Sequence, residues 1–533
     1  MTSNFELPRS NRLLPKLKKL SRGPWSLTSH DRQVVSQYLQ DAAKDLESYQ
    51  VEVNKLKATI LTLEAIQTGL RQTTEKYQAF LAPIRRLPDD ILLEIFGHYC
   101  QTNELRSGRL PAASTLASVC HHWRQATISA PTLWSSFSID FGDWVDTSNG
   151  ADIISDLTIF FLERSQSSAL RIKIHFPYDP GDPPIDFDWA TTMDIIYASS
   201  SRWRSFEMRW CPEYLAQSEA GPLQLPNLRH LTLHTFVPWG PEIGTGILDR
   251  FMECPSLGSV NLDLEGTESR LRLPWTQLEA IELQGCESRP AFSVLSRSRP
   301  QKVTLVNIDD KQRPYDGDGV VLNTVTSLSM QSDYWGPREA DVTLLQHLTL
   351  PSLSSLEIDN LLNEMPQERV QGAIHLNQFI TRSACSITTL RLRSVAFTDT
   401  EILCLLRLTP ALKSLEIAEY KGEAPNRIVT NNFSKHLFVG QEGTDASHMT
   451  FLPVLGELKL SIHANGLDEL ALSDALASRW KPSSRRLRSV EIVLIAGERS
   501  PEGPLSVLQC FKDVGLRFVL SHTSKPRPHT LPR

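Results

Sequence analysis

A short apolar motif recurs through the last two thirds of the chain and constrains the fold more than any other feature. An apolar residue is followed by two variable residues, a second apolar residue, one variable residue and a third apolar residue. Such alternation is typical of a strand with one buried face. The copies are Trp203/Phe206/Met208, Leu228/Leu231/Leu233, Leu257/Val260/Leu262, Leu278/Ile281/Leu283, Val325/Leu328/Met330, Leu353/Leu356/Ile358, Ile387/Leu390/Leu392, Leu412/Leu415/Ile417, Leu455/Leu458/Leu460 and Leu487/Val490/Ile492, with a degenerate copy at Val303-Thr304-Leu305.

The middle residues of successive copies mostly lie 21 to 34 residues apart, and segments with helical periodicity separate them. Examples are "GILDRFMEC", "HLNQFITRSA" and "EILCLLRL". A strand followed by a helix at this period predicts a degenerate leucine-rich-repeat solenoid of parallel strands over residues 150–520. Its concave face would present variable residues to a partner, among them Arg229, His230, Glu279, Glu357, Arg391, Lys413, Glu457 and Arg488.

A second pattern, with a period of 3.5 residues, runs from Val35 to Tyr77. Eleven of its 13 seam positions are apolar or aromatic: Val35, Leu39, Ala42, Leu46, Tyr49, Val53, Leu56, Ile60, Leu63, Gln67, Leu70, Thr74 and Tyr77. This period keeps one seam facing a partner helix and predicts a heptad helix over residues 29–82, capped by Thr28 or Ser29. Either the helix self-associates through residues 35–77, or it folds back onto its own chain.

The next segment, "IRRLPDDILLEIFGHYC", predicts a helix that begins at Leu87-Pro88. Its apolar residues Ile91, Leu92, Ile95, Phe96 and Tyr99 are expected to form one stripe. After a polar insert at residues 101–115, a second helix is expected to carry Leu116, Val119, Cys120 and Trp123 on one face, and to end near "SAP" before Trp134. These two helices predict a small helical unit at residues 83–140.

Composition and motifs argue against several other classes of protein. The formal net charge of −6 gives no reason to expect nucleic-acid binding, and no apolar run is long enough for a membrane span. The eight cysteines are scattered, which favours reduced thiols in an intracellular protein, in the cytoplasm or the nucleus. Nucleotide-binding and hydrolase motifs are absent from the sequence, and adjacent Cys120, His121 and His122 cannot share one ion on a helix. We therefore expect no enzyme activity, cofactor or metal.

The motif "LPDDILLEIF", followed by "LASVCHHWRQATISAPTLW", resembles the F-box, and the whole arrangement resembles F-box proteins of mushroom-forming fungi. The resemblance implies docking onto the Skp adaptor and, through it, onto the cullin scaffold of an SCF-type ubiquitin ligase. It also implies which residues contact the adaptor. These are Leu87, Pro88, Ile91, Leu92, Ile95, Phe96, Leu116, Val119, Cys120, Trp123 and Trp134.

The resulting prediction is a mixed α/β chain: a disordered tail at 1–28, the heptad helix, the F-box, the solenoid, and a second disordered tail at 521–533. Its function would be that of a substrate receptor whose repeats hold an unidentified target protein. The alternative is a structural scaffold, in which the long helix oligomerises the chain and the F-box-like helices only cap the solenoid.

Overall fold

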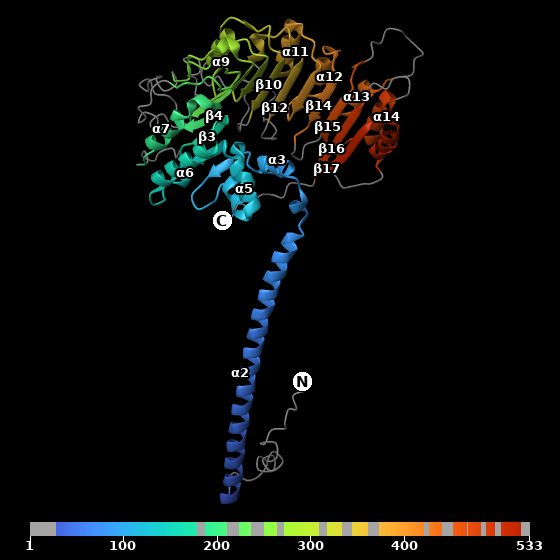
Figure 1. The fold of residues 1–533 in the computed structure, drawn as a ribbon. Coiled ribbons are helices and arrows are strands. Elements are labelled where there is room, and N and C mark those ends of the chain that lie inside the picture. Colours follow the sequence, from blue (N-terminus) through green and yellow to red (C-terminus); the bar gives the residue numbers. More distant parts are fainter. Residues whose placement is uncertain are drawn as a thin grey trace. The chain divides into compact units, whose positions relative to one another are not determined.

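The computed structural model describes residues 28–177, 187–210, 223–235, 250–263, 271–308, 317–332, 344–360, 372–420, 426–439, 451–465, 467–480, 487–495 and 503–523 (Figure 1). The chain divides into two compact units, Met1–Leu92 and Leu93–Arg533. The predicted disordered tail at 1–28 lies almost wholly outside the described residues, as do the first four residues of the segment "GILDRFMEC" and the last ten residues of the chain.

The first unit is dominated by one helix, α2 (Ser29–Phe80), whose 52 residues span about 78 Å at the usual rise per residue. Thr28 caps its start: Thr28 Oγ1 accepts a hydrogen bond from the Asp31 amide at 3.2 Å, and Asp31 Oδ2 accepts one from the Thr28 amide at 3.1 Å. This reciprocal pair satisfies amides that a helix terminus otherwise leaves without partners. The predicted helix and its cap are both confirmed.

The second unit is built on a parallel sheet of 15 strands, in which each strand pairs with the next one along the chain. This sequential order is that of a solenoid, and it confirms the predicted fold class. The strands are β1 (Asn103–Leu105), β2 (Ser136–Asp140), β3 (Leu170–His175), β4 (Trp203–Trp210), β5 (His230–Thr235), β6 (Ser259–Asp263), β7 (Ala280–Gln284), β8 (Lys302–Val306), β10 (Ser327–Ser332), β12 (Ser355–Asn360), β13 (Thr389–Arg393), β14 (Ser414–Ala418), β15 (Glu457–His463), β16 (Ser489–Ile495) and β17 (Arg517–Thr523). A separate two-stranded sheet pairs β9 (Val320–Val321) with β11 (Leu348–Thr349).

The middle residues of the repeated motif form one buried row across the sheet. From β10 onward, for example, the strand pairing places Leu328, Leu356 and Leu390 side by side. The row comprises Leu231, Val260, Ile281, Val303, Leu328, Leu356, Leu390, Leu415, Leu458 and Val490, each at most 2% exposed. Burying each of these side chains contributes about 1.5–3 kcal/mol, so the repeated motif is the core of the solenoid.

Helices follow many of the strands, and α11, α12, α13 and α14 lie along one face of the sheet (Figure 1). The predicted helical segments at 375–384 and 401–408 coincide with α11 and α12 apart from terminal residues. The α-helices of this unit and its boundary are α3 (Asp89–Tyr99), α4 (Ala112–Val119), α5 (His121–Ser129), α6 (Gly150–Arg164), α7 (Ala190–Ala198), α9 (Ser288–Arg297), α11 (Gly372–Ser383), α12 (Asp399–Arg407), α13 (Asn431–Leu437) and α14 (Glu469–Trp480). The main 3-10 segments are η2 (Pro83–Arg86), η3 (Pro131–Trp134) and η10 (Pro504–Val514).

The solenoid extends beyond its predicted bounds at both ends. The sheet begins at Asn103 with β1, which pairs with β2 through the register Asn103↔Phe137. It ends with β17, which reaches Thr523 and so includes three residues that were assigned to the disordered tail. These terminal strands do not stand out in the sequence, because neither carries the full repeated motif and β1 has only 3 residues.

Candidate functional site

Helix α3 (Asp89–Tyr99) carries the first part of the candidate docking site. Two carboxylates, Asp89 and Asp90, occupy its first turn, where they complement the positive end of the helix dipole. The amide of Leu92 donates to the carbonyl of Pro88 at 3.0 Å, so the chain enters the helix directly from the Leu-Pro pair. This agrees with the predicted helix start to within one residue.

The apolar residues of α3 form two stripes rather than the single predicted one. Leu92, Phe96 and Cys100 are buried, with exposed fractions of 1%, 1% and 3%. Residues 91, 95 and 99, each one position earlier, are isoleucine, isoleucine and tyrosine with exposed fractions of 41%, 42% and 56%. Consecutive helix positions point about 100° apart, so one stripe is core and the other faces solvent.

The second predicted helix is in fact two helices, α4 and α5, which meet at Cys120. Cys120 has an extended backbone with φ −160° and ψ 169°, and its sulfur accepts a hydrogen bond from the amide of Trp123 at 3.5 Å. An extended residue that caps the following helix cannot also continue the preceding one. The helical spacing predicted from Leu116 to Trp123 is therefore wrong, and Val119 becomes a terminal residue of α4 that is 56% exposed.

An aromatic contact holds α3 against α5. The rings of Phe96 and Trp123 lie 4.8 Å apart between centroids, with an interplanar angle of 64°, which is a favourable edge-to-face geometry. Arg124 Nε donates to the carbonyl of Ala117 at 2.9 Å and ties α5 to α4. Burial raises the pKa of the neighbouring Cys100 thiol to about 12, so this cysteine stays protonated. Phe96 is thus part of the internal support of the domain.

The predicted insert at residues 101–115 is an ordered part of the fold. It contains β1, and its last residues already belong to α4. The side chain of Asn103 is fully buried: its Nδ2 donates to the carbonyls of Leu133 and Ser136 at 2.9 and 2.8 Å, and its Oδ1 accepts from the amide of Ala113 at 2.8 Å. One amide side chain therefore joins β1, α4, η3 and β2.

Trp134 lies inside the molecule, at the junction with the first solenoid helix. Its indole Nε1 donates to the carbonyl of Thr127 at 2.9 Å, and its ring contacts Phe160 and Phe161 of α6 at centroid distances of 5.5 and 5.2 Å. The ring is 1% exposed. Trp134 therefore connects the helical domain to the solenoid.

The predicted adaptor-contacting residues fall into three groups by exposure. Leu92, Phe96, Leu116 and Trp134 are buried. Leu87, Cys120 and Trp123 are half-buried. Pro88, Ile91, Ile95 and Val119 are exposed. Tyr99 and Leu110, which are exposed at 56% and 67%, were not among the predicted site residues, although the helical spacing from Ile95 marks Tyr99.

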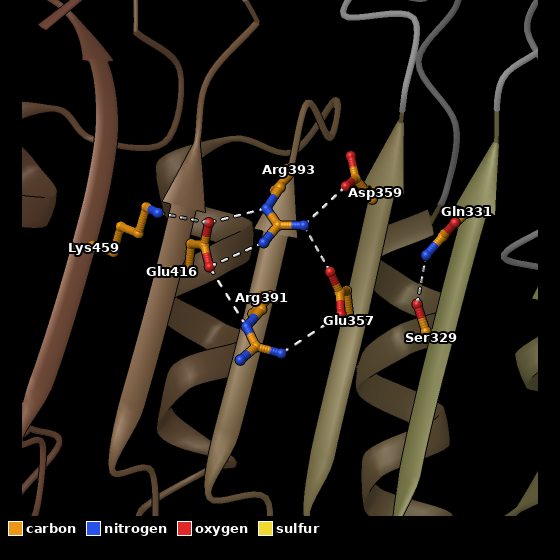
Figure 2. Close-up of polar contacts among 8 residues, drawn as sticks. All are labelled: Ser329, Gln331, Glu357, Asp359, Arg391, Arg393, Glu416 and Lys459. Carbon is orange, nitrogen blue, oxygen red and sulfur yellow. Dashed lines mark hydrogen bonds and ion pairs between the residues drawn. The ribbon is translucent and has the colours of Figure 1, made fainter. Parts of the chain in front are cut away.

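The exposed face of the sheet carries a network of paired charges on β12, β13 and β14 (Figure 2). The Arg393 guanidinium contacts Glu357 at 2.7 Å, Asp359 at 3.0 Å and Glu416 at 3.0 Å. Arg391 lies 3.6 Å from Glu357 and 3.5 Å from Glu416. These carboxylates raise the pKa of Arg393, with Glu416 the largest cause. Charges of opposite sign alternate from strand to strand and satisfy one another.

With this geometry established, the chain can be compared with known proteins. Residues 84–140 match the F-box-like family model, and this range takes in α3, α4, α5, β1 and β2. The chain therefore carries an F-box-like domain, a module for protein interaction, followed by a repeat sheet of parallel strands. Its resemblance to F-box proteins is confirmed over these residues. No curated protein matches the chain.

In the part of the chain that the structure describes, no group of three or more His, Cys, Asp or Glu side chains is arranged to hold a metal ion. Over the same described ranges, no helix combines the length and apolar character that crossing a membrane requires.

Proposed function

We propose that this protein is the substrate-receptor subunit of an SCF-type ubiquitin ligase, with the F-box-like domain docking onto the Skp adaptor and, through it, onto a cullin scaffold. The observation that carries the proposal is the solvent-facing stripe on α3 within the matched range. Ile91 and Ile95 lie four residues apart on one helix, and neither is used by the core. Apolar anchors at this spacing suit docking into a partner groove.

In the receptor role, the exposed and the buried apolar stripes of α3 have different functions. The exposed residues Ile91 and Ile95, together with Pro88, would contact the adaptor. The buried residues Leu92 and Phe96 would hold the helix in place for that contact. The proposal includes no catalytic step in this chain: its repeats bind the target protein, and ubiquitin transfer is left to the partner subunits.

The test is co-purification of the full chain with the Skp adaptor. Replacing Ile91 and Ile95 together by aspartate puts two charges into the apolar contact and should weaken capture about tenfold or more. The matched control carries Ile374→Asp and Leu470→Asp, which change two exposed apolar residues on α11 and α14. The receptor role is refuted if wild type fails to capture the adaptor, or if the two variants capture it equally.

A scaffold role is the second candidate, and the continuity of the sheet favours it. Because β1 and β2 lie in the matched range and also begin the solenoid, the F-box-like domain covers the first edge of the repeats. An exposed sheet edge promotes aggregation, so a cap has value by itself. Capture of the adaptor through Ile91 and Ile95 decides between a cap alone and a cap that also docks.

Self-association through α2 is part of the same proposal. Leu46, Leu56, Ile60 and Leu63 of the heptad seam are 52–69% exposed, which is a large unpartnered apolar surface for one helix. Isoleucine at a and leucine at d favour a parallel pair. Glu52 precedes the seam residue Val53, and Lys57 follows Leu56, so they occupy the g and e positions that attract each other across a parallel pair.

Sedimentation of the full chain tests this association. Wild type should sediment as a dimer, and Leu56→Asp with Ile60→Asp should give a monomer. The control places the same two charges off the seam, at Leu61 and Ala65, and should stay dimeric. A monomeric wild type, or equal dissociation of both variants, would remove self-association from the proposal.

A further inference from the structure

A cluster of cationic residues lies on the exposed face of β3, β4 and β5, at the opposite end of the sheet from the network of Figure 2. The strand pairing aligns Arg171 with Ser205 and His230, and Lys173 with Glu207 and Thr232. The amide of Arg229 donates to the carbonyl of Arg204 at 2.9 Å, which sets these two arginines on adjacent strands. We call Arg171, Lys173, Arg204, Arg229 and His230 the basic cluster.

The electrostatic environment of His230 shows that Arg171, Arg204 and Arg229 lie near its imidazole. The pKa of His230 is lowered, first by burial and then by the positive charges of Arg204, Arg171 and Arg229. Three guanidinium groups therefore act on one imidazole. No salt bridge is recorded for these three arginines within the described ranges, whereas Arg391 and Arg393 each face several carboxylates.

Glu207, the carboxylate that the strand register places beside the cluster, is already paired. Glu207 Oε2 lies 2.9 Å from Lys173 Nζ, and Glu207 Oε1 lies 3.6 Å from His175 Nε2. The contact from His175, followed by that from Lys173, lowers the pKa of Glu207 to about 2. The acids on the neighbouring strands, Asp140 and Asp263, are aligned with His175 and His234 at the far end of the strands. They are not aligned with Arg171.

We propose that the basic cluster is the docking surface for a carboxylate-rich segment of the target protein, an inference that rests on the receptor role proposed above. The cations are spread over three strands, about 4.8 Å apart across the sheet and about 6.6 Å apart between alternate residues along a strand. This spacing matches successive Asp or Glu side chains of an extended peptide. The aligned serines Ser205 and Ser259 add hydroxyl donors.

The geometry of guanidinium recognition favours carboxylates over other anions. Guanidinium groups bind planar carboxylates through two parallel hydrogen bonds, and several separated guanidiniums suit several separated carboxylates. A single phosphate would instead require the cations to converge on one point.

The experiment measures binding of a labelled oligoglutamate peptide to the purified full chain by fluorescence anisotropy. Oligolysine, an uncharged glycine–serine peptide and a phosphoserine peptide of equal charge serve as comparison probes. The variant Arg171→Gln, Arg204→Gln and Arg229→Gln should weaken oligoglutamate binding about tenfold, from three exposed ion pairs of modest strength. Rising salt should weaken it further.

The control variant carries Lys413→Gln, Arg488→Gln and Arg517→Gln, which remove the same number of exposed positive charges from the other end of the sheet. It should bind oligoglutamate like wild type. The inference is overturned if wild type does not bind the peptide, if both variants lose equal affinity, or if the phosphoserine peptide binds far more tightly.

Adaptor capture in the same preparations keeps the two proposals separable. A chain that captures the adaptor without charge-dependent peptide binding retains the receptor role and loses this docking surface. A chain that binds oligoglutamate through the basic cluster and does not capture the adaptor supports the surface and refutes the receptor role. Unchanged circular dichroism of the glutamine variants excludes unfolding as the cause of lost binding.

Discussion

Replacing Asn103 by alanine removes the side chain that joins the F-box-like helices to the first strands of the sheet. Three hydrogen bonds are lost, to the carbonyls of Leu133 and Ser136 and from the amide of Ala113. A hydrogen bond contributes about 1 kcal/mol net, so the junction should lose about 3 kcal/mol. The backbone groups that lose their partners are largely buried, so about 3 kcal/mol is a lower bound on the lost stability.

Amide hydrogen exchange is the suitable assay, because a chain of this size need not unfold in one step. A loss of about 3 kcal/mol should speed exchange on the order of 100-fold in β1, β2 and α4. Exchange in β14 to β16, far along the sheet, should not change. Asn103→Asp should be worse than alanine, because its buried carboxylate would face two carbonyl oxygens that repel it. Protection in β1 that is unchanged in Asn103→Ala would refute the reasoning.

Three further predictions concern the solenoid. Glu419→Ala should lower the free energy of unfolding by about 3 kcal/mol, because Glu419 Oε1 accepts hydrogen bonds from the amides of residues 427, 428 and 429. Glu419→Gln keeps an oxygen acceptor and should lose less stability in a thermal-shift assay. Arg393→Met should cost about 1–2 kcal/mol in chemical denaturation, with a smaller loss at high salt, because Asp359 loses its ion pair while Glu357 and Glu416 keep only longer ion-pair contacts. The pKa of Glu207 is about 2, below its ordinary 4.5, so its contribution to stability is complete above pH 4.5 and is lost as the pH falls toward 2. Glu207→Gln should flatten that part of a profile of stability against pH. An unchanged profile would contradict the lowered pKa of Glu207.

The repeated motif could be predicted from sequence because each copy satisfies a local rule. Alternation of apolar residues places Leu328 and Met330 on one face of a strand whatever the neighbouring strand is. The degenerate copy at Val303 was found in the same way and forms β8. Strands β1, β2 and β17 escaped prediction because they lack the full motif, and their place in the sheet is fixed by pairing with a neighbour.

The candidate docking site was predictable in its location and only partly in its residues. "LPDDILLEIF" identified the helix and the domain. It could not separate Ile91 and Ile95 from Leu92 and Phe96, because all four are apolar and lie within two turns. Phe96 is assigned to the core by its contact with Trp123. The helix of Trp123 begins at this point because the extended backbone of Cys120 ends α4 and caps α5.

The sequence by itself determined the kinds of element and their order: a heptad helix, an F-box-like helical domain and a run of parallel strands. Hydrophobic periodicity sets these locally, residue by residue. The tertiary structure alone decided that residues 101–115 contain the first strand of the sheet, and which apolar stripe of α3 faces solvent. It also decided that Arg391 and Arg393 are paired with carboxylates, whereas Arg171, Arg204 and Arg229 form no salt bridge among the described residues. Burial and charge pairing depend on residues far apart in the chain, so only the folded sheet, which aligns Arg171 with His230, reveals them.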